Sequence, residues 1–273
     1  AWSFCPQAGR EGQAGTEDAA DLAPLDEAGA GLETVLAVEG QVVAMPQAPG
    51  GVELHHPVIE VITPVRDEPP VPLSKREMKV ALPTLLDHAV VANRHPARRA
   101  AFRLAAAAMA GFRATLQAAG FTEIQTPKIV ASATESGANV FRLDYFGRDA
   151  FLAQSPQFYK QIMVGVFERV YEVGPVFRAE PHDTARHINE YVSLDAEMGF
   201  IRDHLDVMAQ CRDVIAGMLA ALGESCRAEL DMLGVALPAV PVEIPRIHFA
   251  DAQDLILARH GVDVRGEPDL SPQ

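Results

Sequence analysis

Hydrophobic and polar residues alternate along some stretches of the chain and recur at helical spacing along others. Residues 35–44 and 52–65 alternate as β-strands do, and turn-forming residues (MPQAPGG, 45–51) separate them. Residues 96–119 and 203–223 carry apolar side chains at the spacing of helices. The pattern therefore predicts a small β unit, followed by a larger region with two long helices.

Between the two long helices, residues 173–200 (VGPVFRAEPHDTARHINEYVSLDAEMGF) hold two apolar runs joined by a short polar loop. Alternate residues of a strand lie on opposite faces, so these runs predict a hairpin with one packed face and one charged face. The charged face comprises Arg178, Glu180, Arg186, His187, Asp195 and Glu197.

The charged face has two interpretations. Buried charges are strongly unfavourable unless they are paired, so such a face is expected to line a wet cleft. Arginine and histidine beside carboxylates would suit a ligand that carries phosphate and ammonium groups. The alternative is a solvated outer face whose charges form ion pairs, because most charge runs are exposed to solvent.

The helix predicted at 96–119 has a proline in its first turn and is followed by Gly120, a common helix stop. Five apolar residues recur along it at helical spacing and are expected to face the core: Phe102, Ala105, Met109, Phe112 and Leu116.

Composition divides the N-terminal part of the chain. Residues 1–33 are rich in Ala, Gly, Asp and Glu without sustained periodicity, and we expect them to be disordered. Residues 34–66 hold the two alternating stretches. Prolines at positions 64, 69, 70 and 72 then indicate a stiff connection, and residues 67–95 are interpreted as a linker or hinge.

The net charge of −14 argues against a general nucleic-acid binder, although a local basic surface remains compatible with tRNA. No apolar run reaches the length of a membrane-spanning helix, and the N-terminus lacks the pattern of a signal peptide. Cys211 and Cys226 lack metal-ligand spacing and are expected to be buried thiols in a reducing compartment. We therefore expect a cytoplasmic protein with no membrane partner.

The sequence of 173–200 resembles motif 2 of class II aminoacyl-tRNA synthetases, in the aspartyl/asparaginyl branch, through FRAE, a short loop, RHINEY and LDAEMGF. Other blocks follow in the expected order. Residues 121–128 (FTEIQTPK) are similar to motif 1, residues 133–141 (ATESGANVF) to the substrate-gating loop, and residues 151–161 (FLAQSPQFYKQ) to the aspartate-recognition segment. The resemblance runs from about Leu36 to the C-terminus and is greatest to the archaeal-type aspartyl enzyme.

The resemblance implies an α+β fold. Residues 96–273 would form the N-terminal part of a class II catalytic domain, an incomplete antiparallel sheet flanked by helices. Residues 34–66 would be the remnant of an OB-fold anticodon-binding β-barrel, the alternative being a small hairpin packed on the main domain. No glycine-rich motif 3 is found, and the acidic magnesium ligands are expected outside these residues, so the chain is interpreted as a fragment or a truncated relative.

The resemblance also implies roles for individual residues. Arg178 would be catalytic, bridging the amino-acid carboxylate and the α-phosphate of ATP. The aspartate-binding residues would be Glu135, Gln157, Lys160 and Asp195, with Lys160 on the substrate side chain and Asp195 on its ammonium group. ATP would be bound by Arg178, Glu180, Arg186, His187 and Tyr191. Without the neighbouring blocks, Gln157 and Lys160 would be read as a helix-capping residue and a solvated lysine.

The implied activity is that of an aspartate–tRNA ligase, which uses ATP and Mg²⁺ to activate aspartate and then transfers it to tRNA. The expected partners are tRNA-Asp, alone or with tRNA-Asn, and a second copy of the chain in a homodimer. One alternative is an asparaginyl-tRNA synthetase or a tRNA-free paralogue, although Lys160 favours a charged aspartate. The other is a non-catalytic module for tRNA binding or dimerisation. Loss of motif 3 leads us to expect no activity from these residues alone.

Overall fold

The computed structural model describes residues 29–48, 50–67, 69–73, 75, 77–135, 139–181 and 187–270. Most of the segment predicted to be disordered, residues 1–28, therefore lies outside the described residues. The chain divides into two compact units, residues 1–100 and 101–273, which are described separately below.

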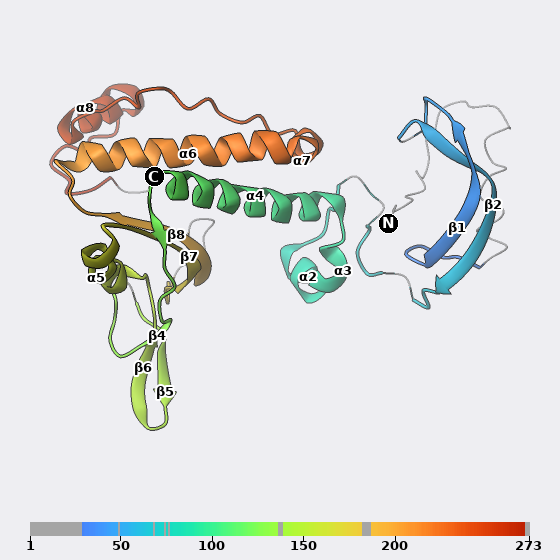
Figure 1. Cartoon of the computed structure of the whole chain (residues 1–273), viewed down its shortest axis with the longest axis horizontal. Helices are drawn as coiled ribbons and strands as arrows, with labels where there is room; N and C mark the ends of the chain where they lie inside the picture. The colour runs from blue at the N-terminus through green and yellow to red at the C-terminus, as the bar shows by residue number, and fades with distance from the viewer. Residues whose placement is uncertain are drawn as a thin grey trace. The chain divides into compact units, whose positions relative to one another are not determined.

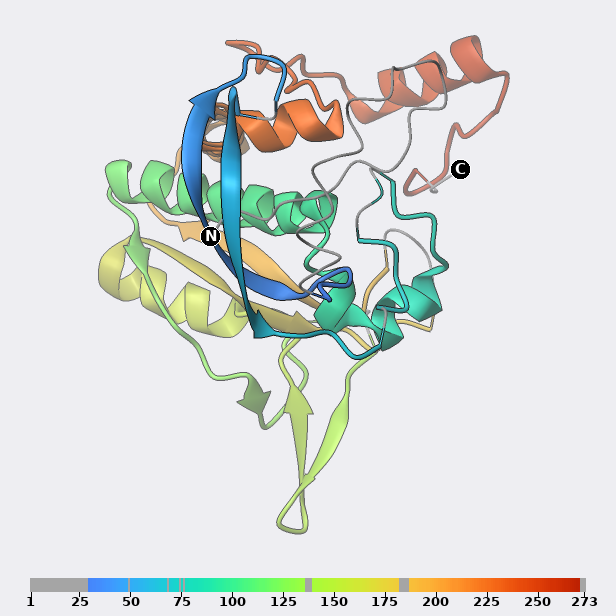
Figure 2. The same ribbon diagram turned by 90° about the vertical axis from the view of Figure 1, so that its right-hand side faces the viewer.

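The first unit contains a long antiparallel hairpin of β1 (Val35–Ala44) and β2 (Val52–Thr63) (Figure 2). The pairing register shifts between Glu39 and Gln41, where the strand bulges. These two strands agree with the predicted partial OB-fold. Apolar residues remain exposed on both of them, with Val42 66% and Val58 70% accessible, because two strands cannot enclose a core.

The interval predicted to be a linker contains two short helices, α2 (Leu82–Asp87) and α3 (Ala89–Ala92). Pro83 stands at the first turn of α2, where its missing N–H leaves no hydrogen bond unmade. After α3, the buried His95 accepts a hydrogen bond at Nδ1 from the N–H of Ala97, and its Nε2 lies 2.8 Å from the Lys75 carbonyl oxygen. His95 thus ties the preceding segment to the start of the next helix.

The larger region begins with a long helix and continues through two small sheets (Figure 1). In chain order its elements are α4 (Pro96–Ala118), β3 (Thr122–Glu123), β4 (Ile129–Val130), β5 (Arg142–Tyr145), β6 (Arg148–Leu152), α5 (Gln157–Phe167), β7 (Arg169–Phe177), β8 (Glu190–Met198), α6 (His204–Ser225), α7 (Arg227–Leu233) and α8 (Phe249–His260). The strand orders are β3-β7-β8 and β4-β6-β5. All pairs are antiparallel except β3–β7, which is parallel. Mostly antiparallel sheets with helices confirm the predicted α+β fold.

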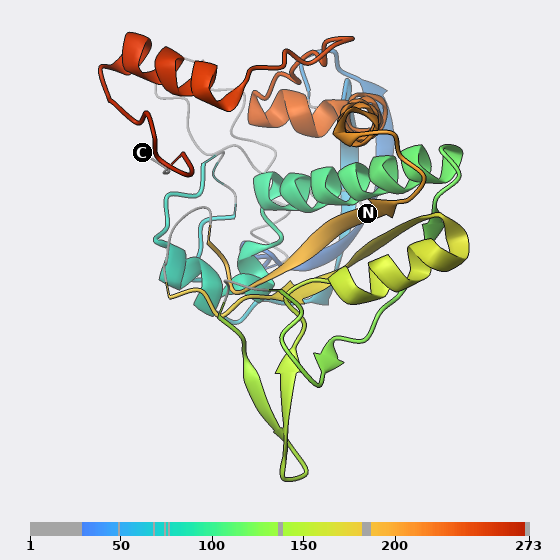
Figure 3. The ribbon, with the colours of Figure 1, turned by 90° about the vertical axis from the view of Figure 1, so that its left-hand side faces the viewer.

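Helices α4 and α6 lie together on one face of the β7–β8 hairpin, as Figure 3 shows. The core between them contains side chains from α4, β7 and α6, with β8 contributing partly buried residues: Phe112, Leu116, Phe121, Tyr171, Val173 and Val214, joined by Met109, Leu194, Met198 and Met218. Helix α5 lies against the opposite face of the hairpin (Figure 3). Among the described helices, none combines the length and the apolar character that a bilayer-spanning helix needs.

Two glycines allow α4 and α6 to approach closely. A Cβ at Gly111 would lie 2.8 Å from the Gly217 carbonyl oxygen, 2.8 Å from Met218 Cα and 2.9 Å from Ala221 Cβ. Such distances are too short for a real Cβ, so the crossing requires glycine at this position.

Two burial predictions were wrong. Phe102 is 62% exposed and Ala105 is also exposed, because only the C-terminal part of α4, from Met109 onward, lies over the sheet. Cys211 is exposed on α6, whereas Cys226 is buried as predicted.

Candidate functional site

The β7–β8 hairpin separates polar from apolar side chains as the sequence predicted. Leu194 and Met198 point into the core beneath α4, whereas Asp195 and Glu197 lie on the face that α5 covers. Strand β7 pairs with β8 so that Glu172 faces Asp195. Residues opposite each other in an antiparallel pair share a face, so three carboxylates gather on this side of the hairpin.

Lys160 provides a positive charge among these carboxylates. It lies in the first turn of α5, only 5% of its surface is exposed, and its Nζ is 2.9 Å from Asp195 Oδ1 and 3.6 Å from Glu197 Oε2. The Ser193 hydroxyl also hydrogen-bonds Asp195 Oδ2. A buried ammonium requires such partners, so the alternative of a solvated lysine is wrong. Gln157, half-buried, begins the same helical turn.

Arg178 and Glu135 form a second ion pair. Strand β7 ends at Phe177, so Arg178 follows the strand, although its N–H still donates to the Asn189 carbonyl oxygen at 2.9 Å. The Arg178 Nη2 lies 3.0 Å from Glu135 Oε2. Among the described residues, the buried Arg178 Nε has no hydrogen-bond partner. A buried donor without an acceptor is unfavourable, so this nitrogen is suited to an acceptor that a ligand would bring.

The remaining predicted site residues are placed only in part. Tyr191 pairs with Val176 and lies on the face of β8 that carries Ser193 and Asp195. Glu180 follows Arg178 and donates its N–H to the Arg178 carbonyl oxygen at 2.8 Å. His187 is half-buried at the start of the returning arm, and Arg186 lies outside the described residues.

Sequence reasoning missed a buried cluster beside this face. Glu172, 1% exposed, accepts hydrogen bonds at Oε1 from Lys128 Nζ (2.8 Å) and the Thr126 N–H (3.1 Å), and at Oε2 from the Thr126 hydroxyl (2.7 Å). A glutamate in the otherwise largely apolar run VYEVGPVF was the available signal, because a buried carboxylate needs donors. The cluster fixes residues 126–128 to β7.

Sequence reasoning also missed a buried pair that joins two predicted blocks. Gln154 Oε1 accepts from the backbone N–H groups of Thr134 (3.2 Å) and Glu135 (3.1 Å). In return, Thr134 Oγ1 accepts from the N–H groups of Gln154 (3.1 Å) and Ser155 (3.2 Å). Glu135 is thereby tied to the segment that leads into α5.

The residues do not offer a magnesium site. Among the described residues, no group of three His, Cys, Asp or Glu side chains is arranged to hold a metal ion. Asp195 and Glu197, two carboxylates on one face of the hairpin, are paired with the Lys160 ammonium. The Mg²⁺ that the resemblance implies therefore has no donor set here.

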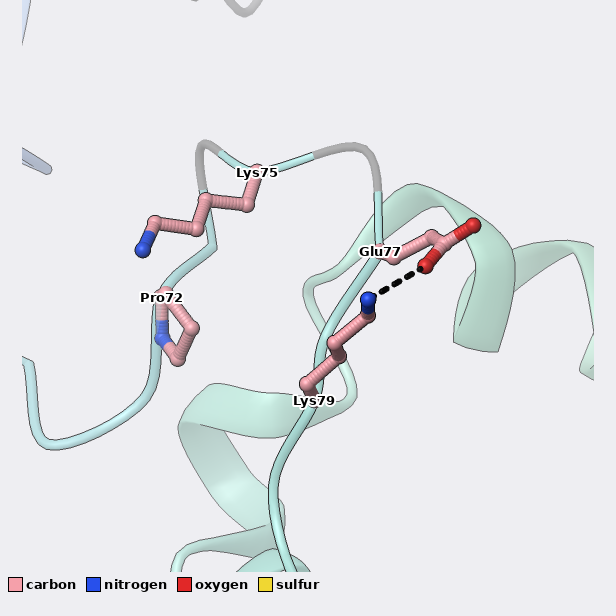
Figure 4. A pocket seen from close by; sticks show the side chains of 4 residues that line it. All are labelled: Pro72, Lys75, Glu77 and Lys79. Carbon is pink, nitrogen blue, oxygen red and sulfur yellow. Dashed lines mark ion pairs between the residues drawn. The ribbon is translucent and has the colours of Figure 1, made fainter.

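One hollow is lined by none of these residues. It belongs to the first unit and is lined by Pro72, Lys75, Glu77 and Lys79, with Lys79 Nζ 3.5 Å from Glu77 Oε2 (Figure 4). Its side chains are exposed lysines and one glutamate, and none was predicted to bind substrate. The two ion pairs at Lys160 and Arg178 remain the candidate site.

Comparison with known proteins shows the family of the chain. Residues 82–269 match the family model "tRNA synthetases class II (D, K and N)". The "Aspartate--tRNA(Asp/Asn) ligase" of Deinococcus radiodurans is 48% identical over 241 residues, which are 88% of this chain and 55% of that protein. That of Thermus thermophilus is 45% identical over 232 residues, which are 85% of this chain and 55% of that protein. The chain thus spans about 55% of the length of these curated relatives.

A solved structure of a tRNA synthetase also superposes on the chain. The asparaginyl-tRNA synthetase from Pyrococcus horikoshii complexed with asparaginyl-adenylate superposes with a TM-score of 0.82 at 31% identity. The match covers 90% of this chain and 56% of that one. The resemblance noted in the sequence is confirmed, and the chain belongs to the class II tRNA synthetases of the D, K and N group.

Proposed function

We propose that the chain forms the aspartate- and ATP-binding part of an aspartate–tRNA ligase. The observation that carries the proposal is the buried Lys160. It lies in the segment similar to the aspartate-recognition segment and is paired with Asp195 and Glu197 of β8. The proposal is supported by curated relatives named aspartate–tRNA(Asp/Asn) ligases at 38–48% identity.

The charges around Lys160 suit aspartate as the ligand. The lysine has two carboxylate neighbours. The substrate ammonium can therefore pair with Asp195, while Lys160 keeps Glu197 as a neighbour and binds the substrate's side-chain carboxylate. Charge-assisted hydrogen bonds are roughly twice as strong as neutral ones, so an asparagine amide would gain less from the same lysine. Glu135 and Gln157 complete the proposed amino-acid site.

Arg178 is the proposed catalytic residue. Its planar guanidinium can contact the aspartate α-carboxylate and the α-phosphate of ATP together, and its Nε finds no acceptor among the described residues. The carboxylate oxygen attacks the α-phosphorus, a new P–O bond forms, and the bond to the leaving pyrophosphate breaks. The tRNA's terminal ribose hydroxyl then attacks the aspartyl carbonyl and AMP leaves. Alignment and charge neutralisation drive both steps.

The nucleotide would be held by the residues that follow β7 and begin β8. We propose that Glu180 accepts from the adenine amino group, Tyr191 stacks on the adenine ring, and His187 and Arg186 contact the phosphates. Mg²⁺, when bound, would neutralise triphosphate charge, but no group of His, Cys, Asp or Glu among the described residues is arranged to hold it.

The wider assignments are proposals on the same basis. Residues 34–66 would be the remnant of an anticodon-binding OB-fold, 67–95 a linker, and 96–273 the N-terminal part of the catalytic domain. The protein would act in the cytoplasm as a homodimer on tRNA-Asp, and on tRNA-Asn as well if it shares the Asp/Asn range in its relatives' names. One observation favours asparagine as a second candidate substrate, namely the superposition on an enzyme complexed with asparaginyl-adenylate.

Titration calorimetry with non-hydrolysable sulfamoyl analogues of aspartyl- and asparaginyl-adenylate separates the two substrates. Hydrogen bonds to charged groups contribute about 1.5–3 kcal/mol, so the aspartyl analogue should bind roughly 10- to 100-fold more tightly. Lys160→Met should remove this preference. Equal binding of both analogues, or tighter binding of the asparaginyl one, would contradict the proposal.

A further inference from the structure

We propose that Thr134 and Gln154 are positioning residues, which hold Glu135 against Arg178 and so determine the affinity for the amino acid. The inference rests on the proposed function and extends it to two residues that touch no substrate. Both are almost fully buried, Thr134 at 4% and Gln154 at 0% exposed, so their polar groups serve the protein interior.

The contact between them is reciprocal. The Gln154 side-chain oxygen accepts two consecutive N–H groups, those of Thr134 and Glu135, and the Thr134 hydroxyl oxygen accepts two consecutive N–H groups, those of Gln154 and Ser155. Four hydrogen bonds therefore fix the backbone of Glu135 relative to residues 154–155. With the backbone fixed, the Glu135 carboxylate reaches Arg178 at 3.0 Å.

The same segment is anchored to the other parts of the site. The Ala153 N–H donates to the Lys128 carbonyl oxygen, and the Ala153 carbonyl oxygen accepts from the Phe177 N–H, both at 2.9 Å. Phe177 immediately precedes Arg178. On the other side, Ser155 Oγ accepts the Gln157 N–H at 3.2 Å, at the start of the helix that carries Lys160. The segment of the Thr134–Gln154 pair is thus hydrogen-bonded both to the residue before Arg178 and to the first turn of the helix that carries Lys160.

This arrangement has a direct consequence for ligand binding. Glu135 neutralises Arg178 in the structure and must keep a defined position when a ligand carboxylate competes for that guanidinium. A misplacement of about 1 Å can lower the rate at an active site by about 100-fold. A binding site likewise needs its contact residues held to within about 0.5 Å by supporting hydrogen bonds. Removing the Thr134 hydroxyl should therefore weaken amino-acid binding, although Thr134 itself lies behind the site.

Thr134→Val is the informative change, because valine has the same shape and lacks the acceptor oxygen. Thr134→Ser keeps the oxygen and should bind the aspartyl analogue as tightly as the wild type does. Thr126→Val is the control, since the hydroxyl of the half-buried Thr126 donates to Glu172 and makes no contact with the Glu135 segment. Titration calorimetry would measure the Kd of the aspartyl sulfamoyl analogue and of ATP alone, with Tm recorded for every variant.

We expect Thr134→Val to raise the Kd of the aspartyl analogue about 10-fold or more and to change the Kd of ATP about 2-fold at most. Thr126→Val should lower Tm without changing either Kd. In a Glu135→Gln background the effect of Thr134→Val should largely disappear, because Thr134 acts through that carboxylate. If Thr134→Val does not fold, Thr134→Ala removes the same oxygen with less bulk.

Two results would overturn the inference. One is an unchanged Kd in Thr134→Val despite a lowered Tm, and the other is an effect that remains complete in the Glu135→Gln background. Failure of the wild-type chain to prefer the aspartyl analogue would instead contradict the proposed function, so the two failures can be told apart.

Discussion

Gly111→Ala is expected to destabilise the larger unit even though alanine is the better helix former. In a helix interior the exchange of glycine for alanine by itself stabilises by about 1 kcal/mol. At Gly111, however, the new methyl would lie within 2.9 Å of three atoms of α6, and two of them are backbone atoms that cannot rotate away. Overpacking costs about 1–3 kcal/mol and occasionally more, and rigid neighbours place this site at the upper end.

The net effect of Gly111→Ala is therefore a loss of about 2 kcal/mol. For a unit of this size, about 2–4 °C of Tm corresponds to each kcal/mol, so Tm should fall by about 4–8 °C. Gly165→Ala on α5 is the matched control, because a Cβ there meets no atom within 4 Å. The free energy of unfolding of that variant should rise by about 0.5–1 kcal/mol. Thermal denaturation followed by circular dichroism measures both, and a Gly111→Ala protein as stable as Gly165→Ala would refute the close helix approach.

Three further outcomes are expected. Lys160→Met leaves Asp195 and its neighbours without a cation, so unfolding by urea at pH 7 should show a loss of about 3–5 kcal/mol; a loss of only about 0–1 kcal/mol, as for a surface pair, would contradict the buried ion pair. The hydrogen bond from Arg103 lowers the pKa of Glu229, so the stability from this pair is present above the unfolded carboxyl pKa of about 4.3 and is lost as pH falls through the lower folded-state value. The Tm difference between wild type and Glu229→Gln should accordingly shrink as the pH is lowered from 7 toward 3, and a constant difference would contradict the assignment. If the proposed homodimer uses the exposed side of α4, Phe102→Glu should shift sedimentation toward the monomer without lowering the Tm of the monomer, whereas an unchanged dimer would exclude this surface.

The sequence predicted the parts of the site that depend on local periodicity. Alternation alone placed Leu194 and Met198 in the core and Asp195 and Glu197 on the other face, and the structure confirms both. Lys160 was found through the resemblance, since nothing in its local sequence predicts a buried ammonium. The substrate roles of these residues remain predictions.

The contacts that were missed join residues far apart in the chain. Lys128 and Glu172 are 44 positions apart, and Thr134 and Gln154 are 20 apart, so no periodic pattern links them. The exposure of Phe102 was missed for a related reason. A helical stripe predicts which side of a helix is apolar. It does not predict how much of α4 the sheet covers, because that depends on where α6 crosses α4, at Gly111 and Gly217.

The parallel pairing of β3 with β7 has a consequence for folding. Glu123 and Tyr171 are register partners 48 residues apart, and the intervening chain carries Glu135, Gln157 and Lys160. Closing a long loop requires entropy to be lost before its contacts form, so pairings of this kind are slow. The β7–β8 hairpin is local and can form early, whereas the residues of the proposed amino-acid site come together only after the loop has closed. A ligand that binds the closed form alone would therefore raise the population of folded chains, so that, if the proposed site binds aspartate, aspartate would shift the folding equilibrium of that site.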